Sequence, residues 1–477
     1  MFHSSECLNQ YSNTPVLHYS KVLASMNVFG KNILVVGLGK SGLSVVRWLA
    51  KNGARVAVSE IKAEPDLDPQ ILREIMELKA TLEAGGHRKE TFLTADEIIV
   101  SPGVPLDMVP LRAAQERGIP VLGEMELACR LMDTPMVAVT GTNGKSTVTA
   151  MVGAMLEGEG LNVFVGGNIG TPLIDYAASG QKADYAVVEV SSFQLDTMTS
   201  FHPRVAVLLN ISPDHLDRYT NYDAYVRSKL SLFQNQATGD WAVLNDDDPA
   251  LAGFIPREGV RVLRYGSARG KDRRAYLEGK KVRASLPGKD MQAFSLDRCP
   301  LRGEHNRENL MAAVLAGLAL HVRPSVIQQT LDGFRGLPHR LEFVGRIRDV
   351  DFYDDSKATN VDAALRSVTS FETPVVLIGG GRDKGGDYAP LVRAAEGRVR
   401  KAVLLGESRF LMAKAFEGRI PYSMAGDMEE AVVQAFSSAR PNDVVLLAPA
   451  CSSFDMFTDY AHRGRVFKEA VERLGNG

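Results

Sequence analysis

The sequence has 477 residues, a length that predicts about three domains at ~100 to 200 residues each. Hydrophobic residues make up 45% and charged residues 23%, as in folded globular proteins, which excludes a disordered chain, a collagen-like repeat and a coiled coil. The 55 Lys and Arg nearly balance the 57 Asp and Glu, so the net charge of −2 predicts binding neither to nucleic acid nor to a membrane.

Residues 1–25 are polar and lack the basic start, apolar run and cleavage site of a signal peptide. They predict a disordered extension or a misplaced start, with the fold beginning near Met26. The four cysteines are widely spaced and include no close pair that would suggest a metal site or a disulfide. Both features favour the reducing cytoplasm.

From Ile33 onward, short runs rich in Val and Ile alternate with helical patterns, which is typical of βα units around parallel sheets. The pattern restarts twice, which predicts α/β domains over 26–133, 134–337 and 338–477. The expected strands are 33–37, 55–59, 97–100, 120–123, 136–140, 185–190, 205–210, 241–245, 350–355, 374–380, 401–407 and 443–449. Residues 256–300 predict short antiparallel strands, 310–320 a buried helix, and 336–338 a hinge.

A glycine-rich loop, Gly37 to Gly42, separates the first strand from a helix, and Ser59 closes the next strand about 20 residues later. This arrangement is typical of dinucleotide sites. From the residues alone, the loop could bind NAD, bind another diphosphate such as a nucleotide-sugar, or form a tightly packed turn. The loop Ser101-Pro102-Gly103 is expected on the same sheet edge.

The segment Gly141-Thr-Asn-Gly-Lys-Ser-Thr147 directly follows an apolar strand and opens a helix, as a phosphate-binding P-loop does. Its glycines allow backbone N–H groups to surround phosphate oxygens, while Lys145 adds a cation and a hydroxyl reaches Mg²⁺. Val139 stands where the usual motif has its first glycine, so the turn is expected to depend on Gly141. The alternative is a glycine-rich turn with a chance Lys-Ser pair.

A P-loop requires a carboxylate at the end of a neighbouring strand to hold its metal ion. Glu189, which ends an apolar strand, fits that requirement better than the alternative of a solvated edge residue. The loop after the next strand, 211–219, gathers two acids, His215 and Arg218. His215 alone would be read as a surface histidine, but its place on the same sheet edge favours a metal or catalytic role.

Further polar segments follow at expected strand ends or near the hinge. Asn306 and Asn309 share a helical face, although helix capping is the commoner use of asparagine there. The other segments are 338–340, 354–360, 379–384 and 449–455, which suit a substrate carboxylate or a ribose better than a core. We expect Cys451 to be a small buried packing residue rather than a nucleophile, because no His or Asn partner motif accompanies it.

The motifs GTNGKST, VVEVSSFQL, NISPDHLDRY, GEHNRENLMAA, LPHRLE, DDSKATN and APACSSFDMF occur here in the order found in the muramyl-peptide ligases. The chain from about Asn27 to its C-terminus resembles that family. The segments SSFQL, DSKATN and ACSSFD favour the member that adds D-glutamate.

The resemblance implies an N-terminal Rossmann-like domain for a UDP-sugar, a central P-loop ATPase-like domain, and a C-terminal Rossmann-like domain that closes over the site. It also implies a monomeric cytoplasmic ligase that uses ATP and two Mg²⁺ ions. ATP would phosphorylate the alanine carboxylate of UDP-N-acetylmuramoyl-L-alanine, and the amine of D-glutamate would attack the acyl phosphate. The glycine-rich loop at Gly37 would then hold the UDP diphosphate, not NAD.

Site residues follow from the same resemblance. Lys145, Glu189, His215 and Lys229 are the expected catalytic residues. Metal ligands would be Ser146 and Glu189 for one Mg²⁺, His215 for the second, and Lys229 as a carbamate. Without the resemblance, Lys229 would be read as an exposed helical lysine. ATP would contact Gly141, Thr142, Asn143, Gly144, Lys145, Ser146, Thr147, Asn306, Asn309, Arg340 and Asp355.

The UDP-sugar would contact Gly39, Lys40, Ser41, Ser59, Ser101, Gly103, Asn168 and Gln194. D-glutamate would contact Arg218, Lys357, Thr359, Lys384, Ser453, Phe454 and Tyr460, the last of which stands where the family has Phe. Three alternatives stay open: a sibling ligase or folylpolyglutamate-type synthetase with another amino acid, a P-loop switch or binding ATPase, and a Rossmann oxidoreductase.

Overall fold

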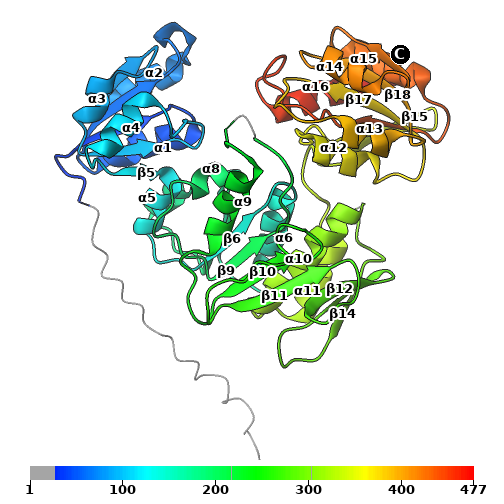
Figure 1. Cartoon of the computed structure of the whole chain (residues 1–477), viewed down its shortest axis with the longest axis horizontal. Coiled ribbons are helices and arrows are strands. Elements are labelled where there is room, and N and C mark those ends of the chain that lie inside the picture. The colour runs from blue at the N-terminus through cyan, green and yellow to red at the C-terminus, as the bar shows by residue number, and fades with distance from the viewer. Residues whose placement is uncertain (1–26, 216–217, 302, 477) are drawn as a thin grey trace, which may run out of the picture.

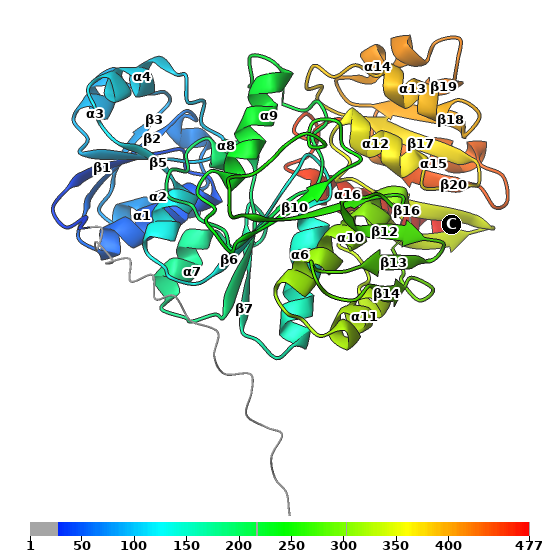
Figure 2. The same ribbon diagram turned by 60° about the horizontal axis from the view of Figure 1, so that its bottom comes forward.

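The computed structural model describes residues 27–215, 218–301 and 303–476, and the predicted extension 1–25 lies outside them. Its strands form three sheets, each covered by helices, and the middle sheet lies between the other two (Figures 1 and 2). The predicted α/β fold with three domains is confirmed.

The N-terminal sheet has the strand order β3-β2-β1-β4-β5, and all of its strand pairs are parallel. Its strands are β1 (Asn32–Val36), β2 (Arg55–Glu60), β3 (Thr81–Ala84), β4 (Glu97–Val100) and β5 (Val121–Gly123). Its helices are α1 (Lys40–Lys51), the 3-10 helix η1 (Glu64–Asp66), α2 (Pro69–Glu77), α3 (Lys89–Leu93) and α4 (Val109–Glu116). Because the strands are parallel, the loops after β1, β2 and β4 open on one edge.

The central sheet has the order β14-β13-β12-β11-β10-β9-β6-β8-β7. Its strands are β6 (Met136–Thr140), β7 (Val163–Gly167), β8 (Tyr185–Glu189), β9 (Val205–Leu208), β10 (Trp241–Asn245), β11 (Arg261–Gly266), β12 (Arg273–Glu278), β13 (Lys281–Ala284) and β14 (Gln292–Ser295). The predicted antiparallel strands are confirmed for β12 to β14, but β11 instead runs parallel to β10 and extends the main sheet.

The helices around the central sheet are α5 (Glu124–Arg130), α6 (Lys145–Gly158), α7 (Leu173–Ser179), α8 (Ser192–Leu195), α9 (Tyr222–Leu230), η2 (Ser231–Phe233), α10 (Glu304–Ala319) and α11 (Pro324–Gly333). Helix α10 is buried on all sides from Leu310 to Ala319, as its uninterrupted apolar run predicts. It packs between α6 and the sheet. Among the described residues, no helix combines the length and the apolar character that a bilayer span requires.

The C-terminal sheet has the order β15-β16-β20-β17-β18-β19, with β15 antiparallel and the other pairs parallel. Its strands are β15 (Glu342–Ile347), β16 (Val350–Asp354), β17 (Val375–Gly380), β18 (Val399–Leu405), β19 (Tyr422–Met424) and β20 (Val444–Leu447). Its helices are α12 (Val361–Val368), α13 (Ala389–Ala395), α14 (Arg409–Phe416), α15 (Met428–Ser438) and α16 (Tyr460–Asn476).

Every strand expected from the sequence is present, whereas β3, β7, β15 and β19 were not predicted. Each of these four strands lies at the edge of its sheet. An edge strand is covered less completely than a central one, so it needs fewer apolar residues and leaves a weaker pattern. In β3 and β15, accordingly, no residue is fully buried.

Candidate active site

The P-loop segment forms the turn between β6 and α6, as predicted. Gly141 and Gly144 have φ angles of 153° and 87°, in the region that favours glycine. A Cβ atom on Gly144 would also overlap the side chain of Asn309, so the turn excludes larger residues. The Lys145 Nζ donates to the carbonyl oxygens of Gly141 and Thr142 over 3.0 and 2.8 Å, which holds the cation over the loop.

Glu189 ends β8 next to the P-loop and is almost fully buried. Its carboxylate accepts hydrogen bonds from Ser146 Oγ over 2.5 Å and from Asn168 Nδ2 over 2.8 Å. Burial favours the protonated acid, but Lys145 and these two donors hold the pKa of Glu189 below its usual range. An ionised carboxylate beside a hydroxyl is an oxygen donor set that fits Mg²⁺.

Lys229 lies on α9 with its side chain turned into the protein and only 1% of the residue exposed. Its Nζ donates to the Gly141 carbonyl oxygen over 2.9 Å and lies 4.7 Å from the centre of the Tyr225 ring. The alternative of an exposed helical lysine is therefore wrong. Burial, followed by the charge of Lys145, lowers the pKa of Lys229 well below the usual lysine value, which favours a neutral amine.

His215 lies in the loop after β9, at the same sheet edge, with a φ of 56°. Its ring packs edge-on against Phe193 at 4.8 Å between centroids. The neighbouring Asp214 faces the C-terminal domain, where Lys384 Nζ lies 3.5 Å from its Oδ1 and Asn360 Nδ2 donates to its Oδ2 over 3.0 Å. The loop that carries His215 is thus held from both domains.

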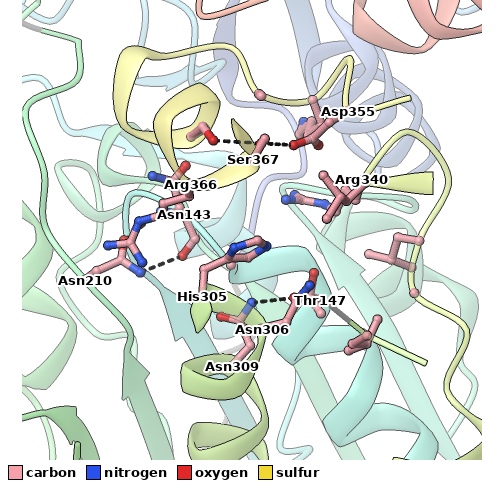
Figure 3. Close-up of a pocket in the computed structure, with 18 residues that line it drawn as sticks. Asn143, Thr147, Asn210, His305, Asn306, Asn309, Arg340, Asp355, Arg366 and Ser367 are labelled. Atoms are coloured by element: carbon pink, nitrogen blue, oxygen red, sulfur yellow. Dashed lines mark hydrogen bonds between the residues drawn. The ribbon is translucent and has the colours of Figure 1, made fainter. Parts of the chain in front are cut away.

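An open cavity lies between the P-loop, the start of α10 and the C-terminal domain (Figure 3). The residues that line it include most of the expected ATP contacts, namely Asn143, Gly144, Thr147, Asn306, Asn309, Arg340 and Asp355. Arg340 also donates from Nη2 to Ser146 Oγ over 2.6 Å. Residues separated by about 200 positions in the sequence are therefore brought to one site.

Burial shifts the pKa values of two titratable residues that line this cavity. Burial raises the pKa of Asp355 to about 6, although a hydrogen bond from Ser367 and the charge of Arg340 oppose this effect. Burial, with the charges of Arg366 and Arg340, lowers the pKa of His305 to about 4, so its ring is neutral near pH 7. The cavity therefore combines cationic arginines with a neutral aromatic ring.

Three models of Mur ligase domains match the sequence. The Mur ligase MurD-like N-terminal domain matches residues 31–123, the Mur ligase middle domain 139–317, and the Mur ligase glutamate ligase domain 339–451. A UDP-N-acetylmuramoylalanine--D-glutamate ligase from Desulfosudis oleivorans is 48% identical over 447 residues, covering 94% of this chain and 97% of the relative. The chain belongs to the Mur ligase family.

A second relative and two solved structures are also similar to this chain. A protein of the same name from Geotalea uraniireducens is 42% identical and covers 95% of this chain and 99% of its own length. Among solved structures, a pseudomurein peptide ligase type C from Methanothermus fervidus has a TM-score of 0.60 at 21% identity, covering 93% of this chain and 100% of its own. The UDP-N-acetylmuramate-alanine ligase MurC from Thermotoga maritima has a TM-score of 0.59 at 20% identity, with the same two coverages. These structures share the fold.

The residues expected to contact the amino acid fall into two groups in this Mur ligase. Lys357 and Tyr460 lie together, with the Lys357 Nζ 3.7 Å from the centre of the Tyr460 ring. Ser453 is buried, whereas Phe454 is 63% exposed. Arg218 lies apart from them, because its guanidinium donates to the carbonyl oxygens of Gly103 and Val104 over 2.8 and 3.0 Å.

The side chains expected to contact the UDP-sugar are mostly bonded within the protein. Ser59 Oγ lies 2.8 Å from His87 Nδ1, and Ser101 Oγ donates to the Gly37 carbonyl oxygen over 3.0 Å. Lys40 reaches the Gly170 carbonyl oxygen in the central domain. Gln194 is buried in a capping box with Ser191 at the start of α8. Gly39 caps the start of α1, and Ser41 lies in the first turn of that helix.

Sequence reasoning missed several side chains at this site. Asn210 accepts from the Asn143 N–H over 2.8 Å and so shapes the P-loop. Asp362, at the start of α12, accepts from Asn143 Nδ2 over 2.8 Å and from Ser212 Oγ over 3.1 Å, joining the C-terminal domain to the P-loop. Asn210 and His305 belong to the motifs NISPDHLDRY and GEHNRENLMAA, so the sequence offered a reason to consider them. Asp362 lies in no such motif.

Gly42 offers a test of the N-terminal loop. A methyl group at this position would overlap the Gly37 carbonyl oxygen, whereas a methyl group on Gly39 would meet no atom within 4 Å. We expect Gly42→Ala to lower the free energy of unfolding by about 1–3 kcal/mol, and Gly39→Ala to change it by less than about 0.5 kcal/mol. Thermal and denaturant unfolding would measure both. Equal stability of the two variants would contradict the packing described.

Proposed function

We propose that the protein is an ATP-dependent ligase that joins D-glutamate to UDP-N-acetylmuramoyl-L-alanine, releasing ADP and phosphate, in cytoplasmic peptidoglycan precursor synthesis. The observation that carries the proposal is that Glu189, Lys229 and Arg340, from three separate segments, all bond to the P-loop beside the cavity that Arg340 lines. Relatives that match nearly the whole chain are named UDP-N-acetylmuramoylalanine--D-glutamate ligases.

Phosphoryl transfer from ATP to the alanine carboxylate requires that negative charge be neutralised on both reactants. Lys145 is proposed to hold the β- and γ-phosphates, because its Nζ already lies over the phosphate loop. Ser146 or Thr147, with Glu189, would hold one Mg²⁺, and His215 a second. Bound Mg²⁺ would neutralise part of the negative charge on the reacting groups.

Lys229 is proposed to be carbamylated. A neutral amine adds to carbon dioxide, forming an N–C bond and releasing a proton, and so becomes an anion. The lowered pKa of Lys229 supports this step, because burial favours the neutral amine, which is the form that reacts. A carbamate close to the Gly141 carbonyl would help to attract metal ions, which an ammonium group in the same place would repel.

The remaining residues would bind and orient the substrates. Asn306, Asn309, Arg340 and Asp355 are proposed to contact the nucleotide, and Lys357, Thr359, Lys384, Ser453, Phe454 and Tyr460 the D-glutamate. The N-terminal loop at Gly39 to Ser41 and Asn168 would contact the UDP-sugar. We propose domains 26–133, 134–337 and 338–477, each of which encloses one of the matched Mur ligase domains, in a monomeric enzyme.

The test is ADP release with UDP-N-acetylmuramoyl-L-alanine and a panel of amino acids. We expect turnover with D-glutamate and none with meso-diaminopimelate or L-alanine. Turnover with either of those amino acids in place of D-glutamate would show a sibling ligase instead. ATP hydrolysis that needs no sugar-peptide would indicate a P-loop switch.

Nucleotide binding is expected to take up a proton through Lys357. Burial, with the nearby charge of Arg340, lowers the pKa of Lys357 to about 7, and the residue lines the cavity. Phosphates stabilise the protonated amine and raise its pKa. At about pH 8, where the free amine is mostly neutral, MgATP binding should therefore take up as much as about one proton, and much less at about pH 6.

Calorimetry in buffers of different ionisation enthalpy measures this uptake. Lys357→Met should abolish this proton uptake, whereas Lys414→Met, at an exposed lysine on α14, should leave it unchanged. Uptake of the same size in Lys357→Met would assign the proton to another group.

A further inference from the structure

Arg463 is a buried arginine on the first turn of α16, with 2% of its surface exposed. Its Nε donates to Ser356 Oγ over 2.9 Å, and its Nη2 donates to the Ser356 carbonyl oxygen over 2.8 Å. Its Nη1 donates to the carbonyl oxygens of Cys451 and Ser452 over 3.2 and 3.3 Å. These acceptors are all neutral, which is unusual because buried arginines are normally paired with carboxylates.

The acceptors belong to two loops that leave the C-terminal sheet at the same edge. Ser356 follows β16, and Cys451 and Ser452 follow β20, which pairs with β16 in parallel. A third loop, after β17, joins them through Arg382, whose N–H donates to the Ser452 carbonyl oxygen over 2.9 Å. The Ser452 N–H donates back to the Arg382 carbonyl oxygen over 3.1 Å. The Arg463 guanidinium therefore bridges two strand-end loops, and two backbone hydrogen bonds tie the third loop to one of them.

These loops carry the residues to which the proposed function assigns the amino acid. Lys357 and Thr359 follow Ser356, Ser453 and Phe454 follow Ser452, and Lys384 follows Arg382. Helix α16 contributes Tyr460 one turn before Arg463, and Ser356 Oγ donates to the Tyr460 carbonyl oxygen over 2.7 Å. Lys357, Thr359, Ser453 and Phe454 are thus within three residues of a group that Arg463 holds, and Tyr460 is one turn away on the same helix. Lys384 is linked to the bridge only through the backbone pairing of Arg382 with Ser452.

We propose that Arg463 is a positioning residue for the amino-acid substrate: by bridging the loops after β16 and β20, it sets the distance between the groups that bind the two ends of that substrate. The inference rests on the proposed function. Its chemistry requires arginine, because a planar guanidinium donates in several fixed directions at once, whereas a lysine ammonium is a compact point donor. Burial lowers the pKa of Arg463 to about 10, so it stays charged near pH 7.

A general role in stability makes a different prediction from a positioning role. Loss of a bridge that only stabilises the domain would lower the melting temperature and the fraction of active enzyme, and would leave every KM unchanged. Loss of a bridge that sets the spacing of one pocket raises the KM of the ligand bound there, because small displacements of binding groups are costly. The P-loop lies in another domain and is not held by Arg463.

The test compares Arg463→Met and Arg463→Lys with Arg465→Met, which removes an exposed arginine from the same helix. We expect both Arg463 variants to raise the KM for D-glutamate by about tenfold or more, while the KM values for ATP and UDP-N-acetylmuramoyl-L-alanine change by less than about twofold. Arg465→Met should match the wild type. A wild-type KM for D-glutamate in Arg463→Lys, or equal changes in all three KM values, would overturn the proposal.

If thermal melting shows that both Arg463 variants fail to fold, the KM of Ser356→Ala for D-glutamate tests the proposal instead. That change removes only one acceptor of Arg463 and one donor to Tyr460, and we expect about a threefold rise in the KM for D-glutamate. An unchanged KM in Ser356→Ala would then overturn the proposal. The wild type is assayed first with the panel of amino acids. If it turns over an amino acid other than D-glutamate, the proposed function has failed, and the Arg463 variants are then compared by their KM for that amino acid.

Discussion

Replacement of Lys229 by alanine should reduce the turnover of the ligase by about a thousandfold, the scale typical of losing a charged group that stabilises a transition state. The Nζ of Lys229 lies against the Gly141 carbonyl oxygen, inside the loop proposed to hold the phosphates. As a carbamate, the side chain would carry the negative charge that helps to place Mg²⁺. Alanine removes that charge and leaves a space near the loop. Steady-state ADP release measures the loss.

Two further measurements separate a carbamate from an ordinary lysine. Small carboxylates such as acetate should partly restore turnover to Lys229→Ala, because they can enter the space and supply an anion. Wild-type enzyme incubated with ¹³C-bicarbonate should show a carbamate carbon signal that Lys229→Ala lacks. Arg227→Ala, which changes an exposed cation on the same helix, is the matched control. Wild-type turnover in Lys229→Ala would end the carbamate proposal.

Replacement of Arg340 by methionine should lower kcat/KM for ATP by about a hundredfold or more. Arg340 comes from the segment after the hinge, yet its guanidinium donates to Ser146 Oγ on α6 and lines the nucleotide cavity. It therefore places a positive charge beside the phosphate loop only when the C-terminal domain is docked. Methionine keeps most of the side-chain volume and removes both the charge and the bond between domains.

The control for this prediction is Arg335→Met, which removes an exposed arginine five residues earlier in the chain. It should leave kcat/KM for ATP unchanged. The Arg340→Met variant should also retain its melting temperature within a few degrees, because one hydrogen bond contributes about 1 kcal/mol to stability. A large loss of stability with unchanged kinetics would show that Arg340 holds the domains together and has no role toward ATP.

The sequence predicted the fold well where burial is complete. The strands at the centre of each sheet, such as β1, β6 and β17, are buried along almost their whole length and left continuous Val- and Ile-rich runs. Helix α10 left an equally clear apolar run. Edge strands are less covered, and in β19 no residue is fully buried, so their patterns are weak. The parallel pairing of β11 with β10 depends on the neighbouring strand rather than on β11 itself.

The candidate site was predictable where its chemistry is local. The P-loop occupies one continuous segment whose glycines and lysine must follow a strand, so its place could be read directly. Glu189 and Asp355 were predictable because both end or follow an apolar strand and therefore lie at a ligand-binding edge. The phosphate-side groups and the sheet edge that carries them were thus determined by the sequence alone.

The tertiary structure decided which way the remaining side chains turn. Lys229 has the local sequence of an exposed helical lysine, and only the packing of α9 against the P-loop buries its amine. Arg218 was expected at the amino acid but bonds to the N-terminal domain at Gly103. Arg463 and Asp362 meet partners about 100 and 220 residues away, respectively. Such contacts leave no local pattern, because a side chain's environment is set by segments that are distant along the chain and adjacent only after folding.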